Sequence, residues 1–437
     1  MSASIRVHSS DRDSLLGQRL GLFVHWGLYA INGLHEQEQW RYHQDRETYR
    51  HLAERFDPRG FDPDAWVQMA RSVGMEYLVV TAKHHDGWCL WDTRLTAFNS
   101  MRAPCGRDLI AEIAAACRRG GLRMGLYYSV VDWHHPAYPN QGRHHELPAQ
   151  AEDTPDMPRY VDFVKAQVEE LVTRYGEIAS WFWDMNVPQW QDPSVNAIIR
   201  QHQPGCIIND RGFGPGDLGS AEREYHPGIM AQRRFSAPTE HCTSVGRWSW
   251  GYKADEDYFS AKHLRYLVAG VLGKGGNELL NIGPDAEGRI PRQAQRLLGD
   301  LGTWYKTVQE AFRGTEPASH LTTNEDVLLT RRGRSLFVIL HREPAAAGIP
   351  LLPLAMEPMA ATLLNDGRPV DWLFNRLPMA EAPVTAKHLR LRQLPLELAA
   401  VEPLVVRLDF GQDLRLPQET TPNNSSQSAG SPTDMNA

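Results

Sequence analysis

Short apolar runs alternate with longer amphipathic stretches between residues 21 and 283 of the 437-residue chain. The apolar runs indicate strands that are covered on both faces, and they are residues 21–26, 77–82, 124–129, 180–183, 206–209 and 278–283. Amphipathic stretches at residues 64–73, 108–119 and 160–175 indicate helices between these strands. Regular alternation of this kind predicts an α/β fold with a parallel sheet.

The length of the alternating part favours a (β/α)8-like, TIM-type barrel over an open doubly wound sheet. No GxGxxG motif opens a helix after an early strand, which argues against the doubly wound alternative. Beyond residue 316, short strand-like runs with proline-rich spacers predict a small C-terminal antiparallel β-sandwich. We therefore expect a catalytic barrel domain at residues 1–315, a sandwich at residues 316–411 and a disordered polar tail at residues 412–437.

The charge balance excludes one class of partner. The chain has 46 Lys and Arg against 53 Asp and Glu, so it lacks the basic excess that neutralises nucleic-acid phosphates. No apolar run of about 18 residues occurs, so we expect no membrane association. The N-terminal residues are polar and show no signal-peptide core, which predicts a cytoplasmic protein. The five cysteines show no CxxC or zinc-like spacing.

Polar and aromatic side chains gather where the predicted strands end. In chain order they are His25, then His84 and His85, then Tyr127, then Asp184, then Arg211. Barrel enzymes build their active sites at the carboxyl ends of the strands, so we expect these side chains to meet. Thirteen tryptophans add flat apolar surfaces that suit sugar rings, although most tryptophans serve core packing.

Asp184 follows three aromatic residues, which makes it a candidate for a functional charge. Its alternative role is the N-cap of the next helix. Glycoside hydrolysis needs two carboxyl groups on either side of the anomeric carbon, and Glu222, Glu224 and Glu240 qualify by position as the second.

A cluster of two histidines and an aspartate, at residues 84–86, has the alternative reading of a metal site. Adjacent histidines on an extended segment point to opposite sides, so we expect no metal there.

Several motifs together are far more specific than any one alone. They include KHHDG at residues 83–87, WFWDM at 181–185, GDLGSAE at 216–222 and GGNELLNIGP at 275–284. In order and wording these stretches resemble the α-L-fucosidases of glycoside hydrolase family twenty-nine, over residues 13–312. The resemblance implies a catalytic barrel followed by a β-sandwich, which hydrolyses terminal α-linked L-fucose with retention of configuration and without a cofactor.

The resemblance also implies roles for individual residues. Asp184 matches the family nucleophile, and Glu222 matches the acid/base of one branch. In another branch the acid/base lies in a WE-x-C element, which corresponds to Glu240; we favour Glu222. Matching sugar-binding positions are His25, His84, His85, Tyr127 and Arg211, and matching pocket aromatics are Trp40 and Trp250.

One position departs from the family pattern. Many members place an acidic residue directly before the pocket tryptophan, whereas Gln39 precedes Trp40 here. Either the amide binds a hydroxyl group or Glu38 takes over that role.

Three alternative functions remain. They are a glycosidase for a related sugar such as L-galactose, a sugar-binding protein that has lost catalysis, and a metal-dependent hydrolase. The expected partner is a glycan that carries terminal fucose. The sequence does not determine the linkage, the leaving group or the oligomeric state, for which a homo-oligomer is one of the options.

Overall fold

The computed structural model describes residues 17–140, 146–223, 231–352, 354, 356–376 and 387–413. The tail that was predicted to be disordered lies outside these residues from position 414 on, and so does Glu224. None of the helices in the described part is long and apolar enough to cross a lipid bilayer.

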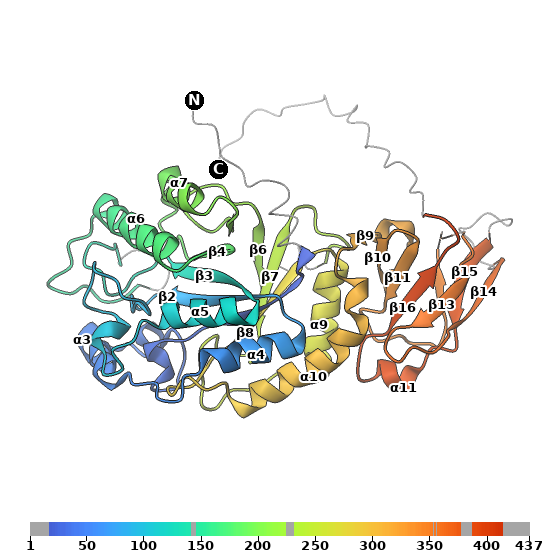
Figure 1. Ribbon diagram of the computed structural model, residues 1–437, viewed down its shortest axis with the longest axis horizontal. Helices are drawn as coiled ribbons and strands as arrows, with labels where there is room; N and C mark the ends of the chain where they lie inside the picture. The colour runs from blue at the N-terminus through green and yellow to red at the C-terminus, as the bar shows by residue number, and fades with distance from the viewer. Residues whose placement is uncertain are drawn as a thin grey trace, which may run out of the picture.

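Eight parallel strands form one curled sheet in the order β5-β4-β3-β2-β1-β8-β7-β6 (Figure 1). They are β1 (Leu20–Val24), β2 (Tyr77–Lys83), β3 (Arg123–Ser129), β4 (Ser180–Asp184), β5 (Ile207–Ile208), β6 (Gly219–Glu222), β7 (Thr239–Ser244) and β8 (Asn277–Ile282). The first and last strands pair in register, with Val24 opposite Ile282. This arrangement confirms the predicted TIM-like barrel. The sequence pattern missed β6 and β7, because both are rich in polar residues.

The barrel is weakest between β5 and β6, where Asn209 and Leu218 form a single parallel bridge. Side-chain bonds of Asn209 reinforce this seam. Its Oδ1 accepts from the backbone N–H of Trp183 at 2.9 Å, and its Nδ2 donates to the carbonyl of Trp183 at 2.9 Å and to Ser220 Oγ at 3.1 Å. The amide therefore links β4 to β6 where strand pairing is short.

Helices cover the outer face of the sheet. They are α4 (Pro63–Val73), α5 (Leu109–Gly120), α6 (Met157–Arg174), α7 (Pro193–His202), α9 (Ala261–Gly273) and α10 (Arg292–Val308). Two short helices, α2 (Glu38–Arg41) and α3 (Arg46–Arg50), lie in the segment between β1 and α4. Short 3-10 turns lie at Leu28–Ala30, His51–Arg55, Ser100–Arg102, Gln309–Ala311 and Ser319–Leu321. Five of the described helices share an aspartate N-cap that accepts a backbone N–H of the first turn, namely Asp45, Asp62, Asp108, Asp156 and Asp192. Three of these five have proline in the first two helical positions.

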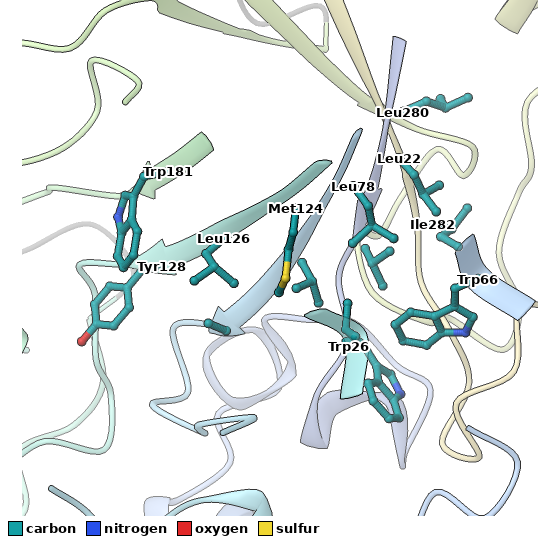
Figure 2. Close-up of a cluster of buried hydrophobic side chains, with 14 of the residues drawn as sticks. Leu22, Trp26, Trp66, Leu78, Met124, Leu126, Tyr128, Trp181, Leu280 and Ile282 are labelled. Carbon is teal, nitrogen blue, oxygen red and sulfur yellow. The ribbon is translucent and has the colours of Figure 1, made fainter. Parts of the chain in front are cut away.

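The side chains on the two faces of the barrel strands belong to two hydrophobic clusters, one against the helices and one in the barrel interior. On β1, Leu22 and Val24 face the helices, whereas Phe23 faces the barrel interior with Tyr127 and Phe182. Figure 2 shows part of the outer cluster, including Leu22, Leu78, Met124, Leu126, Leu280, Ile282, Trp26 and Trp66. Burial on both faces explains why these strands are continuously apolar in sequence.

Eight antiparallel strands follow the barrel and form two sheets, β13-β16-β11-β10-β9 and β12-β15-β14. They are β9 (Glu316–Pro317), β10 (Leu328–Arg332), β11 (Ser335–Ile339), β12 (Ile349–Leu351), β13 (Ala360–Leu363), β14 (Asp371–Arg376), β15 (Lys387–Arg392) and β16 (Val405–Asp409), and α11 (Leu396–Ala399) precedes the last strand. The sheets lie beside α9 and α10 (Figure 1), and Trp304 Nε1 donates to the carbonyl of Pro403 at 3.1 Å.

Two glycines of α10 provide a matched test of how this helix packs against α4. A Cβ at Gly299 would meet no atom within 4 Å, whereas a Cβ at Gly302 would lie 2.7 Å from the Cα of Val73. We expect Gly299→Ala to raise the free energy of unfolding by about 0.5–1 kcal/mol, because alanine favours the helix. We expect Gly302→Ala to lower it by about 1–3 kcal/mol through overpacking against α4. Melting temperatures of the two variants should move in opposite directions, and a shift of the same sign would contradict this packing.

Candidate active site

A cavity of about 1300 Å³ opens at the carboxyl ends of the barrel strands. Nine of the residues predicted for the site line it, namely His25, Trp40, His84, His85, Tyr127, Asp184, Arg211, Glu222 and Trp250. Two predicted residues, Glu38 and Glu240, do not line it. The barrel therefore brings together side chains that are up to 225 positions apart in the sequence.

Arg211 joins the two acidic side chains at the centre of this cavity. Its Nη1 donates to Asp184 Oδ1 at 3.3 Å and to Glu222 Oε2 at 2.9 Å. Since both oxygens contact the same nitrogen, these two distances limit their separation to roughly 6 Å, which is compatible with the spacing of about 5–5.5 Å in retaining glycosidases. Both carboxyl groups remain partly accessible, with side chains 16% and 26% exposed. They can therefore reach a ligand in the cavity.

Tyr127 and His85 hold the other oxygen of Asp184. The Tyr127 hydroxyl donates to Oδ2 at 2.7 Å, and burial raises the pKa of this phenol well above its usual range, so it stays a donor. His85 Nε2 lies 3.9 Å from the same oxygen. Helix α7 takes its N-cap from Asp192, so Asp184 is not a helix cap. The Asp184 carboxyl group is thus held in place at the cavity lining.

His25 has a defined tautomer. The Asn281 amide nitrogen donates to the carbonyl of Trp250 at 2.7 Å, which turns Asn281 Oδ1 toward His25 Nδ1, also at 2.7 Å. Because that oxygen only accepts, Nδ1 carries the hydrogen and Nε2 is left as the acceptor. Burial lowers the pKa of His25 to about 4, so the ring is neutral near pH 7. His25 can thus accept a hydrogen bond from a ligand hydroxyl.

The expectation that His84 and His85 point to opposite sides is wrong. Both rings line the cavity, with centroids 4.0 Å apart, because the chain leaves its extended conformation after β2. Asp86 turns away and accepts from the Tyr49 hydroxyl at 2.7 Å. Among the described residues, no group of three His, Cys, Asp or Glu side chains is placed to hold a metal ion. The two histidines are therefore placed to contact a ligand directly.

Glu240 lies deeper in the barrel than Glu222. In the β6–β7 ladder Glu222 pairs with Cys242, so Glu240 sits opposite Ser220, two residues earlier. Its Oε2 accepts from the Tyr77 hydroxyl at 2.7 Å, and burial raises the pKa of its carboxyl to about 7. This geometry separates Glu240 from the cavity that holds Asp184, so the structure does not support Glu240 as the second catalytic carboxyl.

Glu36, rather than Glu38, supplies the carboxylate near Trp40. Glu38 is buried beside Asn32, whose amide donates to it at 3.0 Å, and Gln39 also lies outside the lining. Glu36 lines the cavity, and its Oε2 accepts from the Ser249 hydroxyl at 2.5 Å and from the N–H of Trp250 at 2.8 Å. Burial favours the neutral acid, but His35 and the Ser249 hydrogen bond together hold the pKa of Glu36 below its ordinary value.

Sequence reasoning missed many of the lining residues, among them His35, Glu36, Arg223 and Trp248. The first two lie in the HEQEQW run at residues 35–40, in which the family pattern concerns only Trp40 and the position before it. The others lie beside the predicted residues Glu222 and Trp250, so sequence neighbourhood was the available signal.

Comparison with known proteins agrees with the family that the sequence motifs indicate. The family model described as "Alpha-L-fucosidase" matches residues 11–310. Tissue alpha-L-fucosidase of Bos taurus is 25% identical over 387 residues, which cover 82% of this chain and 81% of that protein.

Two solved structures are similar over most of the chain. Alpha-L-fucosidase isoenzyme 1 from Paenibacillus thiaminolyticus is 31% identical with a TM-score of 0.80, and the match covers 92% of this chain and 99% of that one. The alpha-fucosidase of Thermotoga maritima, in complex with a mechanism based inhibitor, is 26% identical with a TM-score of 0.72, over 90% and 96% of the two chains. The match of the family model to more than half of the residues establishes that this chain belongs to the α-L-fucosidase family.

Proposed function

We propose that the protein is a retaining α-L-fucosidase, which removes terminal α-linked L-fucose through a covalent glycosyl-aspartate intermediate. The observation that carries the proposal is the pair of carboxyl groups, Asp184 and Glu222, on the same Arg211 nitrogen at 3.3 Å and 2.9 Å. A pair at this spacing leaves room for one anomeric carbon between its members, and too little room for the water of an inverting enzyme.

In the first step Asp184 attacks the anomeric carbon while Glu222 donates a proton to the leaving oxygen. The hydrogen bonds from Tyr127 and Arg211 orient the attacking carboxylate. In the second step Glu222 takes a proton from water, which then opens the glycosyl ester. Ester formation removes the negative charge of Asp184, which makes an ionised Glu222 less costly and suits it to act as the base.

The rest of the cavity matches the chemistry of L-fucose. Its three ring hydroxyls need hydrogen-bond partners, which His25, His84 and Glu36 supply. Its C5 methyl group needs an apolar wall, which Phe23 and Trp250 supply at a ring separation of 6.2 Å. L-Galactose carries an additional hydroxyl at this position, and an apolar wall rejects such a sugar only modestly.

Replacing Asp184 by glycine should remove the nucleophile but keep the cavity. We expect kcat on an aryl α-L-fucoside to fall by at least about a thousandfold, because the covalent step is lost. Added azide should restore turnover and give a fucosyl azide of inverted configuration, since the small anion attacks from the vacated side. Retention of more than about a tenth of the wild-type rate would contradict the assignment of Asp184.

Matched glutamine variants should distinguish the roles of Glu222 and Glu240 by their effects on activity. We expect Glu222→Gln to lower kcat/KM on an unactivated fucosyl disaccharide by about 10²–10⁴-fold, and by much less on an activated nitrophenyl fucoside, whose leaving group needs no proton. Glu240→Gln should keep activity within about threefold, because the Glu240 carboxyl faces Tyr77. The reverse ranking would assign the acid/base role to Glu240.

Glu240 should also make the stability depend on pH. Its pKa in the folded chain is about 7, above the ordinary value of 4.5, so the folded state binds the additional proton. Its stabilising effect is complete below about pH 4.5 and is lost as the pH rises toward 7, by up to about 3 kcal/mol. Glu240→Gln removes this titration, so the difference in melting temperature between variant and wild type should change across that range. Parallel curves would show that Glu240 does not titrate there.

A further inference from the structure

A tryptophan at the cavity mouth is held in place although it is exposed. Trp248 lines the cavity on the loop after β7, and 53% of its surface is exposed. Its Nε1 donates to Asp257 Oδ2 at 2.7 Å, and the Arg247 guanidinium lies over the ring at 5.2 Å from its centroid. The carbonyl of Trp248 lies 3.2 Å from His35 Nε2. Core packing does not account for an indole at this position, since over half of its surface is exposed to water. Its fixed orientation at the cavity mouth therefore indicates a binding role.

Residues 222–223 at the end of β6 and residues 247–250 on the loop after β7 lie side by side, and we call them the wall of the cavity. Arg223 follows Glu222, and its guanidinium lies 4.5 Å from the centroid of Trp250. Its Nη groups donate to the carbonyls of Arg247 and Ser249. Arg223 thereby fastens the end of β6 to the loop that carries Trp248. A general acid stands on the side where the leaving group departs, so a leaving group that receives a proton from Glu222 lies against this wall.

The groups around Trp248 suit a sugar ring. The indole offers a flat apolar face for the C–H groups of a pyranose, and polar groups surround that face. Arg41 and Arg247 also line the cavity, both residues are exposed, and the Arg247 guanidinium lies over the Trp248 ring. Guanidinium N–H groups are donors only, which matches the oxygen-rich edge of a sugar.

We propose that Trp248 is the platform of a leaving-group subsite, which binds a sugar ring next to the fucosyl site. The proposal rests on the proposed fucosidase function and specifies its substrate class, since it requires fucose linked to another sugar. Trp248 contacts the leaving group and takes no part in proton transfer. Its contribution should appear only with substrates whose leaving group is large enough to reach the loop.

The test compares two kinds of substrate across four proteins. The substrates are α-L-fucosyl fluoride, which has no leaving-group ring, and α-L-fucosyl disaccharides with galactose or N-acetylglucosamine. The proteins are the wild type, Trp248→Ala, Trp248→Tyr and the control Trp190→Ala, whose indole is 36% exposed but lies outside the cavity. The quantity measured is kcat/KM for each disaccharide divided by kcat/KM for the fluoride.

We expect Trp248→Ala to lower this ratio by about tenfold or more for at least one disaccharide, and Trp248→Tyr to restore it to within about threefold. Trp190→Ala should keep the wild-type ratio. A Trp248→Ala ratio within about twofold of the wild type for every disaccharide would overturn the subsite and leave the fucosidase assignment intact. If the wild type cleaves neither kind of substrate, the proposed function fails and the subsite fails with it.

Discussion

The shared guanidinium of Arg211 is the contact on which the site depends. Without a cation, two carboxyl groups this close would repel each other, and burial would raise the cost further. Arg211 lies between them at 3.3 Å and 2.9 Å and packs over the Phe182 ring at 5.6 Å. Because one nitrogen contacts both acids, it sets their spacing as well as their charge balance. The closeness of the two carboxyl groups thus depends on one side chain.

Arg211 reaches this position through an irregular part of the barrel. It lies between β5 and β6, where strand pairing is reduced to one bridge and the amide of Asn209 makes the connection. A regular strand would pass through this region with its backbone paired to both neighbours. The shortened β5 instead leaves a loop next to the ends of β4 and β6, where Asp184 and Glu222 stand. Loss of regular pairing at this seam therefore places the cation between the two acids.

Sequence reasoning succeeded where local pattern determines position. The continuously apolar strands predicted the barrel, and a charge directly after three aromatics made Asp184 a candidate, which the structure places in the cavity lining. The choice between Glu222 and Glu240 depended on the β6–β7 register, which no local pattern reveals: a pairing of Glu222 with Cys242 places Glu240 one inward-facing position deeper, about 6.6 Å along the strand. Glu36 was missed for a similar reason, because its partners Ser249 and Trp250 lie 213 and 214 positions away.

Strands and loops divide the site between them. Asp184, Glu222 and Arg211 stand on or next to strand ends, where backbone pairing and neighbouring aromatics restrict their movement. The wall beyond Glu222 is built by the loop after β7, which is fastened by Arg223 and by the hydrogen bonds of Trp248. A change in that loop would alter the surface that meets a leaving group without moving Asp184 or Arg211. In this architecture the barrel strands carry the carboxyl pair, whereas the loop after β7 carries the surface proposed to meet the leaving group.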